Sequence, residues 1–210
     1  LRCVAWRAVI WVIVGGFVVS LQVTIISYLI GLVVGLIFGL MRVSDNPIFY
    51  AFSTLYVEVM RGVPLLVIIL YMGFVVTPRL RQATGGQVDL QGLPAAILAI
   101  AICYGAYMAE VYRGGIESIA HAQLEDAPSL GLNYMQAIRH IVLTQAIRRI
   151  LPPLGNNLIS MLKDSSLISV IALNDLLQTG RLYVSRTYRA FEGYNSVALL
   201  YLTMTLFLSL

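Results

Sequence analysis

Charged side chains occur at two places in this sequence where the neighbouring residues are apolar enough to enter a lipid bilayer. The first place holds Glu58 and Arg61, and the second holds Lys163 and Asp164 with Ser165 beside them. Because an ionised group is costly in hydrocarbon, such residues indicate a transport path or an ion pair that neutralises both charges. We therefore take these five as candidate substrate-path residues.

Helix geometry distinguishes the two places. Glu58 and Arg61 are three residues apart, so they share a helix face and can neutralise each other. The Gly-Val-Pro segment at 62–64 loosens the backbone, so an ion pair that fixes a kink is the alternative interpretation. Lys163 and Asp164 are adjacent and point about 100° apart on a helix, so at least one faces a polar cavity or another helix.

Catalytic and metal chemistry find little support in the sequence. The two histidines, His121 and His140, have no cysteine nearby and no metal-ligand spacing, so we interpret them as surface residues. No glycine-rich phosphate loop with Lys and Ser or Thr is present. Cys3 and Cys103 lie in apolar surroundings and fit small buried side chains. We predict no catalytic residue, no metal site and no cofactor bound by this chain.

The composition is that of a membrane protein. Hydrophobic residues make up 59% of the 210 residues and charged residues only 11%. The net charge of +4 is spread over separated arginines and forms no basic run, so nucleic acid is not an expected partner. We predict an all-α integral membrane helical bundle in a single domain, residues 1–210, with the lipid bilayer around it.

Apolar segments long enough to cross a bilayer alternate with polar ones. After an interfacial start with Trp6 and Trp11, the predicted spans are 17–41, 48–77, 93–109, 150–174 and 193–210. The segments 78–92 and 175–192 are predicted to be aqueous loops. Glu110 and Arg113, again three residues apart, end the third span. Five spans place the two chain ends on opposite sides of the membrane.

The first span carries a stripe of small residues and ends at a helix break. Gly31, Gly35 and Gly39 recur every four residues, a spacing that lets the backbone of another helix approach closely. The polar segment 44–46 is followed by Pro47, and proline is favoured at the first position of a helix. We therefore expect a new helix to begin there.

The longest polar stretch, 113–149, is the expected meeting place with a soluble partner. Ala122, Ala127 and Leu130 suit one face of a short helix, and Pro128 indicates a helix start, turn or kink. After Gly131, residues 133–150 show the apolar spacing of an amphipathic helix that leads back to the membrane. The candidate contact residues are Ala120, Gln123, Glu125, Asp126, Ala127 and Gly131.

This polar stretch resembles the EAA loop of importer permeases that work with an ATP-binding cassette. Matching positions are Glu125, Ala127, Gly131, Ile141 and Leu143, whereas Asp126 and Thr144 stand where Ala and Pro are usual. Further segments resemble the polar amino acid permeases of that class, the histidine, glutamine and general L-amino acid permease family. These segments are 56–65, 106–114, 151–156, 162–167, 185–188 and 191–194.

The resemblance implies a type I importer permease fold with about five transmembrane helices and a cytoplasmic coupling helix. It implies a second permease chain, identical or homologous, and two ATP-binding subunits that bind ATP and Mg and hydrolyse the ATP. It also implies an external substrate-binding protein and a place in the bacterial inner membrane. The transported substrate would be a polar amino acid, and our hypothesis is that it is carried by alternating access. The excess of arginines on the outer side favours an acidic or neutral amino acid, although these arginines can equally dock the binding protein.

An amino acid zwitterion needs an anionic contact for its ammonium group and a cationic contact for its carboxylate. Asp164 and Arg61 can supply these contacts, and Glu58 and Lys163 can tune the charge. Two other classes of membrane protein are alternatives that the sequence does not favour. An ion-driven secondary transporter would show paired halves with broken helices, and an intramembrane enzyme would need a catalytic set. The count of arginines on the two sides of the predicted topology slightly favours an orientation with the polar stretch 113–149 outside the cell. The family motifs outweigh this count and imply the reverse, with the polar stretch in the cytoplasm and the amino terminus outside.

Overall fold

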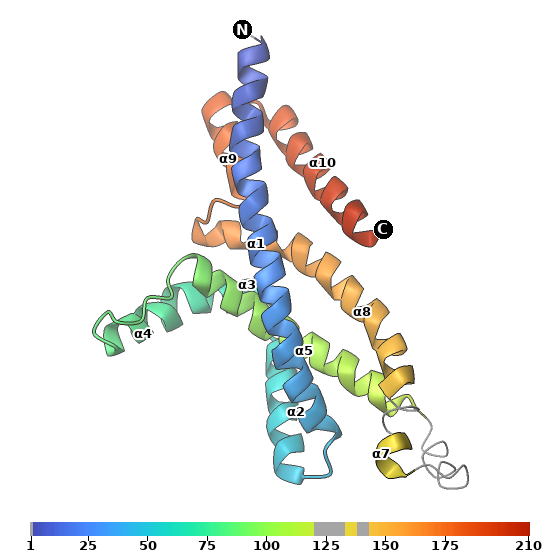
Figure 1. Ribbon diagram of the computed structural model, residues 1–210. Helices are drawn as coiled ribbons and strands as arrows, with labels where there is room; N and C mark the ends of the chain where they lie inside the picture. Colours follow the sequence, from blue (N-terminus) through green and yellow to red (C-terminus); the bar gives the residue numbers. More distant parts are fainter. Residues whose placement is uncertain (1, 120–132, 138–142) are drawn as a thin grey trace. The chain divides into compact units, whose positions relative to one another are not determined.

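The computed structural model describes residues 2–119, 133–137 and 143–210, and every regular element in these ranges is a helix (Figure 1). The fold class predicted from the composition is therefore confirmed. The α-helices are α1 (Arg2–Val43), α2 (Pro47–Gly62), α3 (Leu65–Tyr71), α4 (Thr77–Ala83), α5 (Leu93–Glu117), α7 (Tyr134–Ala137), α8 (Leu143–Asp164), α9 (Leu176–Thr187) and α10 (Ala190–Ser209). Two shorter elements join them, the π-helix η1 (Met72–Val76) and the 3₁₀ helix η4 (Ser165–Ile171).

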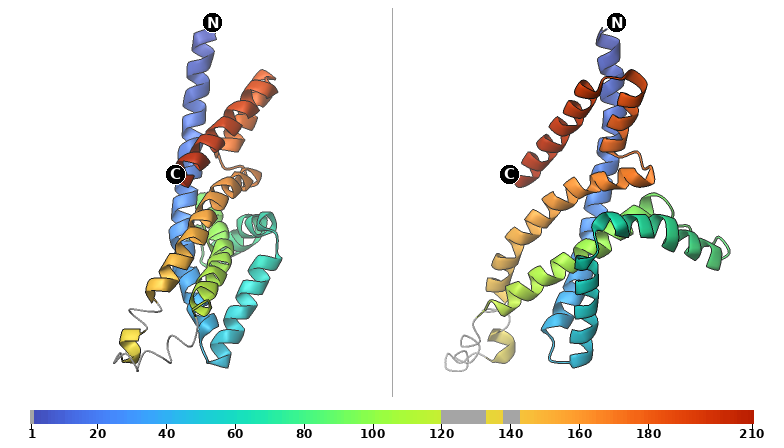
Figure 2. Two further views of the ribbon diagram at one scale, coloured as in Figure 1. Left: turned by 90° about the vertical axis from the view of Figure 1, so that its right-hand side faces the viewer. Right: turned by 180° about the vertical axis from the view of Figure 1, so that it is seen from behind.

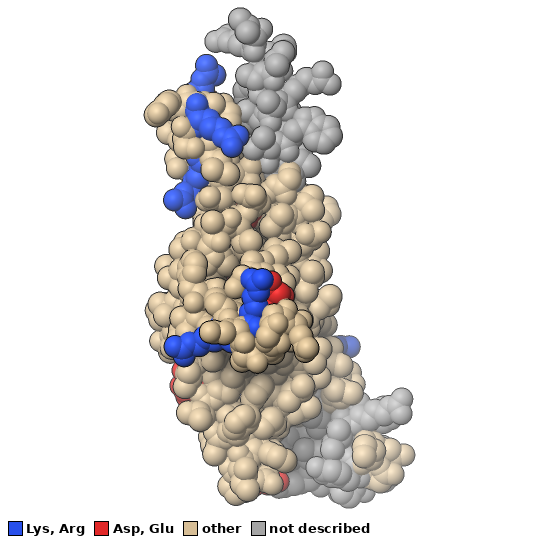
Figure 3. All heavy atoms as spheres, turned by 90° about the vertical axis from the view of Figure 1, so that its left-hand side faces the viewer, with Lys and Arg blue, Asp and Glu red and all other residues tan. Residues whose placement is uncertain are grey.

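Three helical segments of the described chain are long and apolar enough to cross a membrane. They are Gly15–Val43, Leu65–Ala83 and Leu93–Glu117. The first and third confirm the spans predicted at 17–41 and 93–109, and both extend beyond the predicted ends. On the face drawn in Figure 3, acidic and basic side chains are few and scattered over a wide surface that carries neither. The count of five spans stays a prediction.

The second predicted span, 48–77, is not one helix. α2 ends at Gly62 and α3 begins at Leu65, with Pro64 in an extended conformation between them. Proline has no N–H group to donate and disfavours helical geometry in the residue before it, so the helix cannot continue through Val63. The predicted aqueous loop at 78–92 likewise begins as helix, because α4 continues to Ala83.

The fourth predicted span, 150–174, was also wrong as a single helix. α8 begins earlier, at Leu143, and ends at Asp164, after which the chain tightens into η4 and turns at Ala172, whose φ is 58°. The predicted loop at 175–192 contains α9. The aspartate that precedes α9 starts a new helix by capping it, a local signal that outweighs the polar composition of the segment.

Contacts within the chain define two compact units, which we describe separately. One unit contains Leu1–Leu29, Val63–Ala101 and Leu158–Leu210, and the other contains Ile30–Gly62 and Ile102–Asn157. α1, α5 and α8 therefore contribute residues to both units. We call them the first and the second unit below.

Small residues allow close helix packing in the second unit. A Cβ atom added at Gly35 would lie 2.6 Å from Cβ of Met108, and one added at Gly39 would lie 2.8 Å from Cβ of Tyr112. The close approach predicted from the glycine stripe is thus confirmed at these two positions, with α5 as the neighbour. α2 joins the same packing, because the Ser53 hydroxyl donates a hydrogen bond to the Phe38 carbonyl at 2.6 Å.

A buried aspartate organises the first unit. Asp175 is fully buried, and its carboxylate accepts hydrogen bonds from the backbone N–H groups of Leu177 (3.1 Å) and Gln178 (2.9 Å) at the start of α9. The Tyr201 hydroxyl of α10 lies 3.5 Å from the same carboxylate. Both views in Figure 2 show α9 beside α10. The Ser20 hydroxyl of α1 accepts from the N–H of Leu176 at 3.2 Å.

Replacing Asp175 with alanine is expected to lower the free energy of unfolding by about 2 kcal/mol, because two N–H groups at the start of α9 lose their acceptor. Asp175→Asn keeps an acceptor oxygen and is expected to remain within roughly 0.5 kcal/mol of the parent at pH 7. Thermal unfolding of both purified variants in detergent measures the difference. Equal stability of the alanine and asparagine variants would contradict the capping role.

The difference in stability between the parent and the Asp175→Asn variant is expected to depend on pH, because aspartate can gain a proton and asparagine cannot. Burial raises the pKa of the Asp175 carboxyl, while the N–H groups of Gln178 and Leu177 oppose that shift. A raised pKa in the folded state means that the folded protein holds the proton more strongly than the unfolded chain. The contribution of Asp175 to stability therefore falls as the pH rises from its unfolded pKa through its folded pKa. The asparagine variant is expected to gain relative to the parent over that interval.

Candidate functional site

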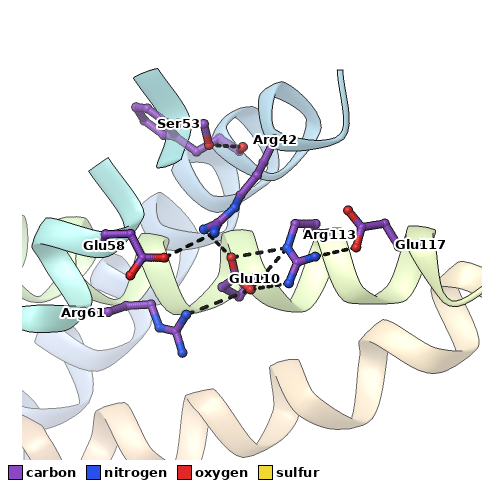
Figure 4. A network of polar contacts seen from close by, with 8 residues as sticks. Arg42, Ser53, Glu58, Arg61, Glu110, Arg113 and Glu117 are labelled. Atoms are coloured by element: carbon purple, nitrogen blue, oxygen red, sulfur yellow. Dashed lines mark hydrogen bonds and ion pairs between the residues drawn. The ribbon is translucent and has the colours of Figure 1, made fainter. Parts of the chain in front are cut away.

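Six charged side chains form a connected ionic network in the second unit (Figure 4). They come from the last turn of α1, from the carboxyl-terminal part of α2 and from the carboxyl-terminal part of α5. The members are Arg42, Glu58, Arg61, Glu110, Arg113 and Glu117. Three arginines face three glutamates, so the formal charges within the network cancel. We call this set the ionic network.

Glu110 is the centre of the ionic network. One carboxylate oxygen pairs with Nη1 of Arg42, and the other lies 2.8 Å from Nη2 of Arg113 and 4.0 Å from Nη1 of Arg61. Its side chain is only 19% exposed. Because charge-assisted hydrogen bonds are stronger where water is partly excluded, this carboxylate holds the carboxyl-terminal parts of three helices together. Arg113 also pairs with Glu117, one turn further along α5.

Glu58 and Arg61 find their partners on neighbouring helices. An ion pair between the two side chains was the alternative interpretation of their spacing, but Nη2 of Arg42 lies 3.3 Å from Glu58 and Arg61 pairs with Glu110. Residues of neighbouring helices thus replace the i,i+3 partner, because both α1 and α5 bring an opposite charge close to α2. Arg61 also lies over the ring of Tyr107, 5.8 Å from its centre, in cation–π geometry.

Glu58 and Arg61, the two proposed path residues of the second unit, are both exposed. The side chain of Glu58 is 63% exposed and that of Arg61 is 41% exposed, whereas Arg42 is 11% exposed. An exposed ion pair contributes little to stability and exchanges readily with other ions. Both Glu58 and Arg61 are therefore accessible to a polar solute, and Glu58 is the most exposed member of the ionic network.

The other three predicted path residues belong to the first unit, at the junction of α8 and η4. Lys163 is exposed and lies in the last turn of α8, where a cation interacts favourably with the helix dipole. Asp164 ends α8 and is half-buried. Ser165 is fully buried, and its hydroxyl donates to the Leu162 carbonyl at 2.7 Å. It stays a proposal that these three residues line the same substrate path as Glu58 and Arg61.

The candidate contact residues of the polar stretch, Ala120, Gln123, Glu125, Asp126, Ala127 and Gly131, lie outside the described residues, as do His121 and His140. The chain that follows them begins with a capping box at α7. The N–H of Asn133 donates to Oε1 of Gln136 and the N–H of Gln136 donates to Oδ1 of Asn133, both at 2.9 Å. The predicted amphipathic helix is thus helical at Tyr134–Ala137 and from Leu143 onward.

α8 packs directly on the end of α5. A guanidinium N–H of Arg149 donates to the Ser118 carbonyl just after α5 ends, and a Cβ added at Gly115 would overlap the side chain of Ile150. These contacts hold the two ends of the polar stretch, 113–149, near each other. The stretch therefore starts and finishes on packed helices.

Two features of the site were missed by reasoning from the sequence. Arg42 was not among the predicted site residues, although it pairs with both Glu58 and Glu110. Its position directly after a long uncharged segment was the available signal, because an arginine there needs a partner or an interface. The capping box Asn133–Gln136 was also overlooked, although Asn-x-x-Gln before a helix is a known start signal. Cys103 is buried, as predicted.

The helices and the ionic network define a class, a helical membrane protein with partly exposed ion pairs at helix ends. Comparison with known proteins identifies the family. The family described as "Binding-protein-dependent transport system inner membrane component" matches residues 31–210, and this chain belongs to it. The chain is thus a transport component rather than an enzyme, and the family implies ATPase partners. Neither the ion-driven transporter nor the intramembrane enzyme finds support.

Curated relatives match most of the chain. "Probable glutamine ABC transporter permease protein GlnM" of Bacillus subtilis (strain 168) is 36% identical over 197 residues, which cover 93% of this chain and 87% of the relative. "Glutamine transport system permease protein GlnP" of Escherichia coli (strain K12) is 34% identical over 208 residues, covering 97% of this chain and 92% of the relative.

Solved structures share the fold. The structure described as "Crystal structure of an amino acid ABC transporter with histidines" is 35% identical and has a TM-score of 0.86, covering 98% of this chain and 93% of that chain. The fold predicted from the resemblance, that of an ABC importer permease, is thereby confirmed.

Proposed function

We propose that this chain forms the translocation path of an ABC importer for a polar amino acid of no net charge, glutamine being the best supported example. The relatives named above are glutamine permeases, and they align with this chain over nearly its full length. The location that fits is the bacterial inner membrane. Two ATP-binding subunits bind ATP and Mg, and an external binding protein delivers the substrate to a pair of identical or homologous permease chains.

The observation that carries the proposal is the charge balance of the ionic network. Its three arginines and three glutamates compensate each other, and Arg61 is held by a carboxylate 4.0 Å away while 41% exposed. A zwitterionic solute can replace such a weak contact without leaving an uncompensated charge behind. Arg61 then contacts the carboxylate of the amino acid and Asp164 contacts its ammonium group, with Glu58, Lys163 and Ser165 completing the path.

Coupling to the ATPases is assigned to the polar stretch. In our proposal Ala120, Gln123, Glu125, Asp126, Ala127 and Gly131 contact the ATP-binding subunits, and closure of these subunits on ATP moves the helices to the outward-open state. Support comes from the helices that flank this stretch, since α5 and α8 are packed against each other by Arg149 and Gly115. Movement of the stretch is thereby passed to two helices at once.

The first experiment identifies the assembly and its cargo. The affinity-tagged chain is purified from its native membrane and the co-purifying chains are identified by mass spectrometry. We expect an ATP-binding subunit and a second permease chain or a second copy. The reconstituted complex with its binding protein is expected to take up radiolabelled glutamine only with ATP inside the vesicles. Uptake by the isolated permease without ATPase would disprove the proposal.

Arg61→Ala and Asp164→Asn are expected to reduce initial glutamine uptake at least tenfold, because each removes one of the two charges that the zwitterion contacts. The matched controls are Arg81→Ala and Asp89→Asn, which make the same changes in an exposed ion pair 3.6 Å long outside the proposed path. The controls are expected to retain uptake within twofold at equal expression. Parental rates in both path variants would remove Arg61 and Asp164 from the path.

A further inference from the structure

When the charge of Glu110 is removed, its three arginine partners differ in whether another acidic partner remains. Arg42 keeps Glu58 as a partner and Arg113 keeps Glu117. Among the described residues, Arg61 has no second acidic partner within 4.0 Å. Loss of the Glu110 charge therefore affects the three arginines differently, and Arg61 most.

The geometry of the three contacts strengthens this difference. Arg113 donates hydrogen bonds to Glu110, one of them at 2.8 Å, which an amide oxygen can still accept. The contact with Arg61 at 4.0 Å is too long for a hydrogen bond and rests on charge alone. An uncharged side chain at position 110 is thus able to preserve the helix contacts while it frees Arg61.

We propose that Glu110 is a positioning residue that sets the net charge the substrate meets at Arg61, and that it thereby determines the preference for a neutral over an acidic amino acid. The inference rests on the proposed function of Arg61 as the contact for the substrate carboxylate. With Glu110 ionised, the guanidinium of Arg61 is already partly compensated and suits one carboxylate. Without that charge, Arg61 attracts a second carboxylate on the side chain of the substrate.

The test is equilibrium binding of radiolabelled glutamine to the purified permease–ATPase complex in nanodiscs, competed by unlabelled glutamate. Glu110→Gln is expected to lower the half-inhibitory concentration of glutamate, relative to that of unlabelled glutamine, by about three- to tenfold. Glu110→Asp restores the charge and is expected to stay within twofold of the parent. Failure of Glu110→Gln to assemble would overturn the proposal, because Glu110 would then be needed for folding.

Glu192→Gln is the matched control. It makes the same acid-to-amide change and removes the same formal charge at an exposed residue in the first turn of α10, outside the ionic network and the proposed path. We expect no shift in the glutamate preference. An equal shift in this variant would show that net charge acts at a distance, and the positioning role would fall.

A double-mutant cycle separates this inference from the proposed function. If Glu110 acts through Arg61, Glu110→Gln adds no further shift to Arg61→Ala. An additive shift would overturn the positioning role and leave the substrate path intact. Unchanged glutamine binding in Arg61→Ala alone would instead refute the path itself.

Discussion

Gly35→Ala is expected to destabilise the protein by about 3 kcal/mol, at the upper end of the usual cost of overpacking. The added Cβ would lie 2.6 Å from Cβ of Met108, 3.0 Å from the Gly105 carbonyl oxygen and 3.2 Å from the Ala109 nitrogen. Backbone atoms of α5 cannot rotate away as the end of a flexible side chain can, so α1 and α5 must separate. Thermal unfolding of the purified complex in detergent measures the loss.

Gly15→Ala is the control for this prediction. It makes the same change in the same helix, but a Cβ added at Gly15 meets no atom within 4 Å. Since alanine favours helix over glycine by up to about 1 kcal/mol, this variant is expected to be as stable as the parent or slightly more stable. Equal stability of the two alanine variants would mean that α1 and α5 do not pack as described.

Gly131→Leu is expected to reduce coupled glutamine uptake more than tenfold while the subunits still assemble and ATP is still hydrolysed. The reason is the proposed docking of the polar stretch into a groove of the ATP-binding subunit, where a bulky side chain at the glycine position prevents close contact. Reconstituted complexes give both readouts, the initial uptake rate and the ATPase rate.

The size of the side chain at position 131 provides the control. Gly131→Ala adds one methyl group and is expected to lose less uptake than Gly131→Leu. The ratio of substrate transported to ATP hydrolysed should fall with side-chain size, and co-purification of the ATPase should be retained. Parental uptake in the leucine variant would contradict the assignment of Gly131 to the coupling contact.

Local patterns explain why much of the fold was predictable. The uncharged segment before Arg42 predicted the first span, and Pro47 predicted the start of α2, because proline suits a first helical position. The four-residue glycine spacing predicted a close helix contact, which Gly35 and Gly39 make. The capping of α9 by Asp175 is equally local, but the polar composition of 175–192 led us to expect a loop there.

The amino-acid sequence by itself determined the helical membrane class, the family and the positions of the charged residues in apolar surroundings. Only the tertiary structure decided which charges pair. Spacing along one helix reveals which residues share a face, and on that basis an ion pair between Glu58 and Arg61 was one of two interpretations. Their partners, Arg42 and Glu110, come from α1 and α5, and such contacts depend on how helices distant in sequence pack, which no local spacing encodes.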